Sequence, residues 1–161
     1  EQGRLEDAMR SFDRALAISD ASHEANYYSA IIYQRWSDYE TAYERYHAAS
    51  EIDGENVQYL LAAAESLIAC DRLDEAQTLL EGRLDHFEHN AAMQHLLAQV
   101  ATIDGDYEAA VDHFRRARML RSDDVVLLEG LVHAQYRAEM FGPCLDSVME
   151  LELVLLSLIH I

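Results

Sequence analysis

The chain has 161 residues, with thirty acidic side chains against twelve basic ones and a formal net charge of -18 at pH 7. All twelve bases are arginine, and a surface this acidic repels phosphates and anionic lipids, which argues against nucleic-acid and membrane-surface binding. Half of the residues are apolar, only one is proline, and no apolar run reaches membrane-spanning length, so we expect an all-α protein without membrane insertion.

The predicted elements are helices joined by short polar turns. Apolar spacing predicts a helix over 4–18, followed by helices over 23–36, 38–52, 57–70, 72–86, 91–103, 106–120 and 125–137. Breaks are expected near 20–22, 37, 53–56, 71, 87–90, 105 and 122–124, and polar pairs at 3–4, 37–38, 71–72 and 105–106 suit tight turns. Four preferred N-cap residues precede helices, namely Ser22, Asn56, Asn90 and Asp124.

Small and aromatic residues recur along the chain at one constant spacing, which we call the repeat interval. One column is Ala8, Ala42, Ala76 and Ala110, and another, four residues later, is Phe12, Tyr46, Leu80 and Phe114. The helices between them carry a third column, Ala30, Ala64, Ala98 and Val132. Small residues at matching places let two helix backbones approach closely. We therefore expect burial at helix–helix contacts for five of these residues, namely Ala42, Ala64, Ala76, Ala98 and Ala110.

Over residues 1–151 this pattern resembles the tetratricopeptide repeat, a helix–turn–helix unit with a period of about 34 residues. The resemblance implies a right-handed α-solenoid of antiparallel helix-turn-helix repeats spanning 1–155. Its parts would be the second helix of a truncated repeat at 1–22, whole repeats at 23–56, 57–90 and 91–124, and a partial repeat at 125–155. Residues 156–161 are expected to be a non-native tail, and the chain a piece of a longer reading frame. Gly82-Arg83 departs from the small apolar residues of the pattern and is expected to weaken packing between the third and fourth repeats.

In the family that the chain resembles, the first helix of each repeat lines a concave groove. By that resemblance the candidate ligand-binding residues are Glu24, Tyr27, Ile31, Gln34, Gln58, Leu61, Glu65, His95, Gln99, Glu129, His133 and Tyr136, with Ile68, Ala92, Thr102 and Val126 beside them. This mixed surface suits an extended peptide or a partner helix that carries basic and apolar residues. None of the sixteen positions is Lys, Arg or Asn, which disfavours the carboxylate clamp that tetratricopeptide co-chaperones use to hold a chaperone's C-terminus.

Other motifs offer little chemistry. His86, Glu88 and His89, with Pro143-Cys144 downstream, have a faint similarity to the zinc signature of nucleobase deaminases, but Ser147 stands where its second cysteine belongs. We therefore predict no metal, cofactor or catalytic residue. The cluster of Arg115, Arg116, Arg118 and Arg121 complements a helix dipole, and its alternative interpretation is a docking patch for an acidic partner. Cys144 falls in the alanine column and is interpreted as a packing residue.

The leading functional hypothesis is a non-catalytic scaffold for protein–protein interaction. The alternative is the recognition arm of a longer multidomain enzyme, such as a transferase, kinase or protease, whose catalytic domain lies outside this sequence. An RNA-binding helical repeat is disfavoured, because such readers need a basic groove. The two cysteines imply no disulfide framework, which leaves the compartment open, with the cytoplasm slightly favoured over the periplasm.

Overall fold

Helices form all of the regular secondary structure in the residues that the computed structural model describes, which are 2–18 and 22–159, with side chains over 5–18 and 22–157. The all-α prediction is therefore confirmed for this part of the chain. The predicted break at 20–22 lies mostly outside it. The chain divides into two compact units, residues 1–82 and 83–161.

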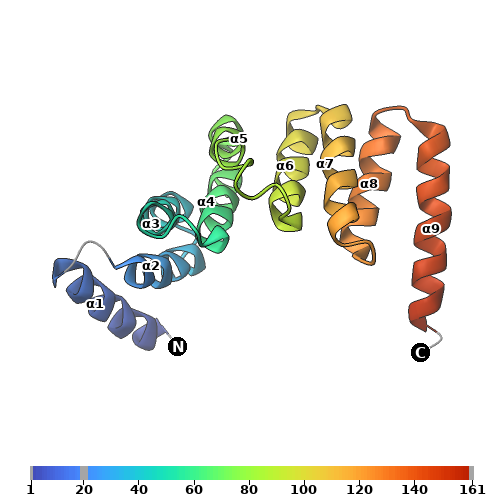
Figure 1. Cartoon of the computed structure of the whole chain (residues 1–161). Coiled ribbons are helices and arrows are strands. Elements are labelled where there is room, and N and C mark those ends of the chain that lie inside the picture. Colours follow the sequence, from blue (N-terminus) through green and yellow to red (C-terminus); the bar gives the residue numbers. More distant parts are fainter. Residues whose placement is uncertain (1, 19–21, 160–161) are drawn as a thin grey trace. The chain divides into compact units, whose positions relative to one another are not determined.

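The first unit is a run of antiparallel neighbours. Its helices are α1 Gln2–Ile18, α2 His23–Arg35, α3 Tyr39–Ile52, α4 Val57–Ala69 and α5 Leu73–Glu81, and each packs against the next along the chain (Figure 1). A core of Ala30, Ala42, Tyr46 and Ala63 joins α2, α3 and α4. Because three of these four residues are alanine, the backbones can approach closely around one large aromatic ring.

The second unit repeats the arrangement of sequential antiparallel helices. Its helices are α6 Ala91–Asp104, α7 Tyr107–Leu120, α8 Val125–Arg137 and α9 Phe141–Ile159, again packed in sequential pairs (Figure 1). Phe114 and Val111 of α7 are buried with Leu127 and Leu131 of α8. Helix α9 continues through part of the segment predicted to be a non-native tail.

The predicted N-caps are confirmed. The side chain of Ser22 accepts a hydrogen bond from the amide of Ala25, and Asn90 accepts one from Met93. Asn56 and Asp124 do the same for amides in the first turns of α4 and α8. These bonds satisfy amides that have no partner inside the helix and so fix where each first helix begins.

Each hairpin turns at a residue in the left-handed backbone region. These residues are Ser37 (φ 60°), Asp71 (φ 60°), Gly105 (φ 87°) and Glu139 (φ 59°), which follow one another at the repeat interval. The predicted breaks at 37, 71 and 105 are confirmed, whereas the fourth turn was not predicted. At that turn the amide of Met140 donates to the carbonyl of Gln135, which closes the end of α8.

The five alanines predicted to be buried are buried, whereas Ala8 and Val132 of the same columns are half-buried. Ala42, Ala64, Ala76, Ala98 and Ala110 each have no exposed surface. Their side chains therefore lie where helices of a hairpin or of neighbouring hairpins meet.

Two expectations about helix ends are wrong. Helix α5 was predicted to reach residue 86 but ends at Glu81, and residues 82–89 form turns. Arg83 occupies the column in which Ala49 and Ala117 are fully buried, and a charged side chain cannot take that place, so the helix ends before it. The turn expected at Gly3-Arg4 is also not formed, because both residues belong to α1.

Candidate functional site

In the first unit, some of the predicted groove residues belong to an aromatic cluster or contact it. The ring of Tyr27 on α2 lies 4.9 Å from that of Tyr59 on α4 and 5.5 Å from that of Tyr46 on α3, measured between centroids. The hydroxyl of Tyr46 donates to Gln34 Oε1 over 2.9 Å. Tyr27 and Ile31 are half-buried against the core, so each presents only part of its side chain to solvent.

Two acidic side chains, Glu24 and Glu65, are exposed near this cluster. Of the other predicted residues of α4, Gln58 is exposed and Leu61 is half-buried. Burial, with smaller contributions from Tyr27 and Glu65, raises the pKa of Tyr46 to about 12. Desolvation raises the pKa of Glu65 as well. A cation placed beside Glu65 would stabilise the carboxylate electrostatically and so offset its desolvation. This face therefore favours positively charged ligand groups.

In the second unit, α6 contributes His95 and Gln99, both half-buried. The imidazole of His95 lies 5.9 Å from the ring of Phe114, and burial lowers its pKa. The side chain is therefore neutral at pH 7 and presents a hydrogen-bonding group rather than a charge.

Three predicted residues of α8 line a cavity against α9. The cavity has a volume of about 390 Å³, and its lining comprises Glu129, His133 and Tyr136 together with Val132, Cys144, Val148 and Leu151. Cys144 is buried and its thiol donates to the carbonyl of Val132 over 3.6 Å, in keeping with a packing role.

The sequence analysis missed Val148 and Leu151 as lining residues. They lie one repeat interval after Phe114 and Ala117, which are buried in the core of the unit. In α9 the residues of these two columns, Val148 and Leu151, border the cavity instead of being buried in a core. The recurring columns were the available signal, and they indicate which α9 side chains border this space.

The described residues offer no metal-binding chemistry, since they contain no group of three or more His, Cys, Asp or Glu side chains able to hold an ion. Within 2–18 and 22–159, no helix has the length and hydropathy needed to span a bilayer.

A fold of repeated helical hairpins with a cluster of tyrosine rings invites comparison with known proteins. Residues 1–83, just over half of the chain, match the model of the family described as anaphase-promoting complex, cyclosome, subunit 3. The chain belongs to this family. The family and the similar solved structures place it in the tetratricopeptide repeat superfamily. A search of curated proteins found no match.

Solved structures with similar folds share little sequence with the chain. MamA from Desulfovibrio magneticus RS-1 is 15% identical with a TM-score of 0.84, over 97% of this chain and 88% of that one. YrrB, a tetratricopeptide repeat protein with an unusual peptide-binding site, is 15% identical with a TM-score of 0.78, over 94% and 78% of the two chains. A chain of the anaphase-promoting complex hetero-tetramer Cut9–Hcn1 is 17% identical with a TM-score of 0.72, over 94% and 30%. At these identities the likeness concerns the fold alone.

Proposed function

We propose that the chain is a non-catalytic interaction scaffold that holds a peptide or helix of a partner protein against the first helices of its repeats. The observation that carries the proposal is the aromatic and acidic face of the first unit, where Tyr27 packs between Tyr46 and Tyr59 beside exposed Glu24 and Glu65. Tyrosine rings supply large contact areas at a low cost in side-chain entropy, which suits them to peptide recognition.

The chemistry of this face selects the partner. It carries carboxylates and aromatic rings and no arginine among its predicted contact positions, so a matching ligand has Arg or Lys between apolar side chains. The cations would lie near Glu24 and Glu65 and over tyrosine faces, and the apolar groups near Tyr27 and Leu61. Apolar anchors would supply most of the affinity, and the charges mainly the association rate.

YrrB, named above for its peptide-binding site, gives this proposal a precedent within the fold. The anaphase-promoting complex structure adds a second, in which a chain of this fold is part of a protein assembly. The alternative of a recognition arm for a longer enzyme has no observation in its favour.

Synthetic peptides in which Arg and Leu alternate, and counterparts with Gln in place of Arg, test the proposal by fluorescence anisotropy. The Arg–Leu peptides should bind, and Tyr27→Ala and Leu61→Ala should each weaken binding about tenfold, the loss expected for removing a buried anchor. Glu65→Gln should chiefly flatten the salt dependence of the association rate.

Glu44→Gln is the matched control, because Glu44 is an exposed acid on α3, outside the predicted contact positions. It changes the net charge equally and should leave the salt dependence as in the unmodified chain. Since Tyr27 also packs on the core, melting temperatures of all variants are measured first. Equal binding of the Arg–Leu and Gln–Leu peptides, or equal effects of Glu65→Gln and Glu44→Gln, would refute the proposal.

A further inference from the structure

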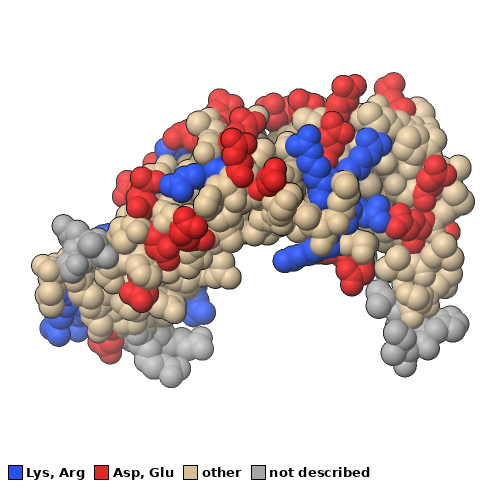
Figure 2. All heavy atoms as spheres, in the orientation of Figure 1, with Lys and Arg blue, Asp and Glu red and all other residues tan. Residues whose placement is uncertain are grey.

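The end of α7 carries the densest positive charge in the chain. Four of the twelve arginines, Arg115, Arg116, Arg118 and Arg121, lie within seven residues. Figure 2 shows the basic side chains of the second unit gathered over this region among acidic ones. The Arg–Met patch is our name for four exposed side chains in this region, namely Arg115, Arg116, Met119 and Leu120.

One arginine of the cluster has a structural task. Arg118 is 17% exposed and binds Glu150 of α9 over 2.5 Å, so it ties α9 to α7. Arg115 contacts Asp112 at 3.6 Å, but both side chains are about half exposed or more, and such pairs contribute little. Arg116 is exposed and forms no ion pair within the described residues. The guanidinium groups of Arg115 and Arg116 are thus available to a ligand, as is that of exposed Arg121 at the end of the helix.

Apolar side chains lie one helical turn beyond Arg115 and Arg116. Met119 is 86% exposed and Leu120 is 41% exposed. Met119 borders two hollows, one of about 460 Å³ shared with Leu84, Gln94, Arg116 and Leu120, and one of about 400 Å³ shared with Arg115 and Arg118. Arginine and methionine are enriched at protein interfaces, and methionine adapts its shape to the group it meets.

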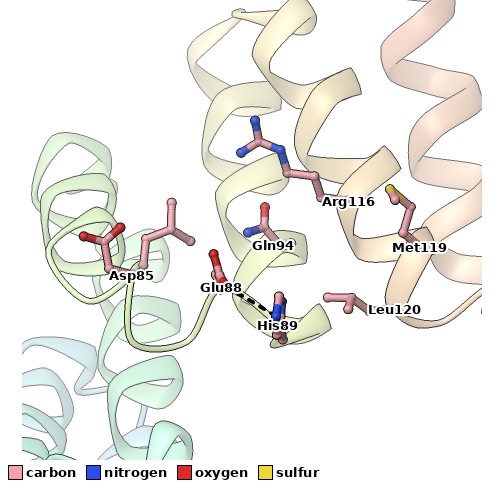
Figure 3. Close-up of a pocket in the computed structure, with 8 residues that line it drawn as sticks. Asp85, Glu88, His89, Gln94, Arg116, Met119 and Leu120 are labelled. Atoms are coloured by element: carbon pink, nitrogen blue, oxygen red, sulfur yellow. Dashed lines mark ion pairs between the residues drawn. The ribbon is translucent and has the colours of Figure 1, made fainter.

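The larger hollow is bordered by the segment that precedes α6. The segment that follows Glu81 forms turns instead of a last helical turn, and its residues 84–89 make the wall opposite α7 (Figure 3). That wall carries Asp85 and Glu88, with Glu88 3.3 Å from the imidazole of His89. The hollow is therefore basic and apolar on the α7 side and acidic on the opposite side.

We propose that the Arg–Met patch docks an acidic segment of a partner protein that carries an apolar side chain next to its carboxylates. Arg115 and Arg116 would hold the carboxylates in charge-assisted hydrogen bonds. The apolar side chain would enter the hollow between Leu84, Met119 and Leu120. Asp85 and Glu88 repel carboxylates from the far wall, which fixes the orientation of the ligand on α7.

The net charge of the chain does not prevent this docking. At physiological ionic strength the screening length is about 8 Å, so distant acids act weakly while the two arginines act at contact distance. A nucleic-acid strand fits less well, because Asp85, Glu88 and Asp112 surround the arginines. Moreover, no Phe, Tyr or Trp is among the described residues that line the hollows to stack on a base.

The test uses peptides in which Glu and Leu alternate and counterparts with Gln in place of Glu, titrated against the full chain. Methyl resonances of its five methionines report where binding occurs. The Glu–Leu peptide should shift the resonance of Met119. Met93, which has no exposed surface, should not move, and Met149, which is 48% exposed on α9, reports unspecific apolar contact.

Replacing both arginines, in Arg115→Gln with Arg116→Gln, should weaken the Glu–Leu peptide at least about tenfold, and Met119→Ser about three- to tenfold. The matched control is Arg10→Gln with Arg14→Gln, which removes two exposed arginines from α1 and should leave the affinity unchanged. Tyr27→Ala and Glu65→Gln should also leave it unchanged, so this site stands or falls independently of the proposed groove.

Three results would overturn the proposal. The first is no binding of the Glu–Leu peptide, or binding equal to that of its Gln counterpart. The second is an equal loss in the α1 control, which would indicate unspecific charge attraction. The third is tighter binding of a single-stranded oligothymidine that shifts Met119, which would make the patch a phosphate-binding surface instead.

Discussion

Two glycines on neighbouring helices show how local packing decides the effect of a single methyl group. A Cβ added at Gly130 of α8 would overlap the ring of Phe114, which is 4% exposed in the core of the second unit. Near Gly142, in the first turn of α9, no atom lies within 4 Å of an added Cβ. Gly130 therefore leaves room for an aromatic ring, whereas Gly142 has no such role.

We expect Gly130→Ala to destabilise the chain even though alanine is the better helix former. The gain in helix propensity is about 1 kcal/mol, and overpacking a buried ring costs about 1–3 kcal/mol, so the net loss is up to about 2 kcal/mol. Gly142→Ala should be neutral or stabilising by up to about 1 kcal/mol. Urea unfolding measures both. Adding Phe114→Leu to Gly130→Ala should recover part of the loss, and a simple sum of the two single effects would contradict the predicted overlap.

Tyr46 links the aromatic face to stability at high pH. Its folded-state pKa is about 12, above the ordinary value of 10.0, because burial disfavours the phenolate. The raised pKa means that the folded state holds the Tyr46 proton more tightly than the unfolded state does. The free energy of unfolding therefore keeps its full value below pH 10 and falls by about 1.4 kcal/mol per pH unit as pH rises toward 12. Tyr46→Phe should remove this contribution to the slope, while costing about 1 kcal/mol at neutral pH through the lost bond to Gln34. Unfolding free energies measured from pH 8 to pH 12 check it, and parallel curves for the two proteins would contradict it.

At the scale of helices and turns, the hairpin corners offer a matched pair. Gly105 and Glu139 occupy equivalent corners one repeat interval apart, both at positive φ, but only the glycine adopts that region without steric cost. Glu139→Gly should stabilise the chain by about 1 kcal/mol, and Gly105→Ala should destabilise it by a similar amount. Thermal melts measure both effects as shifts of the unfolding midpoint in opposite directions. If neither substitution moved the midpoint, the corners would tolerate glycine and other residues equally, and the prediction would be wrong.

The helices could be predicted from the sequence because several independent signals recur together. Caps such as Ser22 and Asn90, corners such as Gly105, and buried alanines all keep one interval, and each has a local physical cause. The end of α5 was missed because Leu84 and Phe87 keep an apolar spacing, while the decisive fact is that Arg83 cannot be buried in an alanine column.

The candidate sites depend on distances between helices, and the recurring residue columns of the sequence do not predict those distances. The resemblance predicts a groove position for Tyr27, but the sequence does not predict its contacts with Tyr46 and Tyr59, because these join three different helices. Arg118 shows the same limit. It stood in a cluster of four apparently equivalent arginines, and only the position of α9 separates it from Arg116 by giving it Glu150.

At the scale of the whole molecule, the excess of acids sets the response to salt. Thirty acidic side chains face twelve arginines, so like-charge repulsion opposes the folded state at neutral pH. Salt also screens attractive pairs, such as Arg72 with Glu75, whose hydrogen bonds lower the pKa of Glu75. Exposed pairs contribute little, however, so the loss of repulsion should outweigh the loss of attraction.

We therefore expect the free energy of unfolding to rise as sodium chloride increases from about 0.01 M to about 0.5 M, while the screening length falls from about 30 Å to below about 10 Å. Urea is the denaturant, because guanidinium chloride is itself a salt. Replacing three exposed acids without an ion pair in the described residues, by Glu44→Gln, Glu108→Gln and Asp123→Asn, should raise stability at low salt and flatten the salt dependence. Glu75→Gln removes one acid from a pair with Arg72 and should instead lower stability. A midpoint that falls as salt is added would mean that ion pairs, and not the net charge, dominate the electrostatics of the fold.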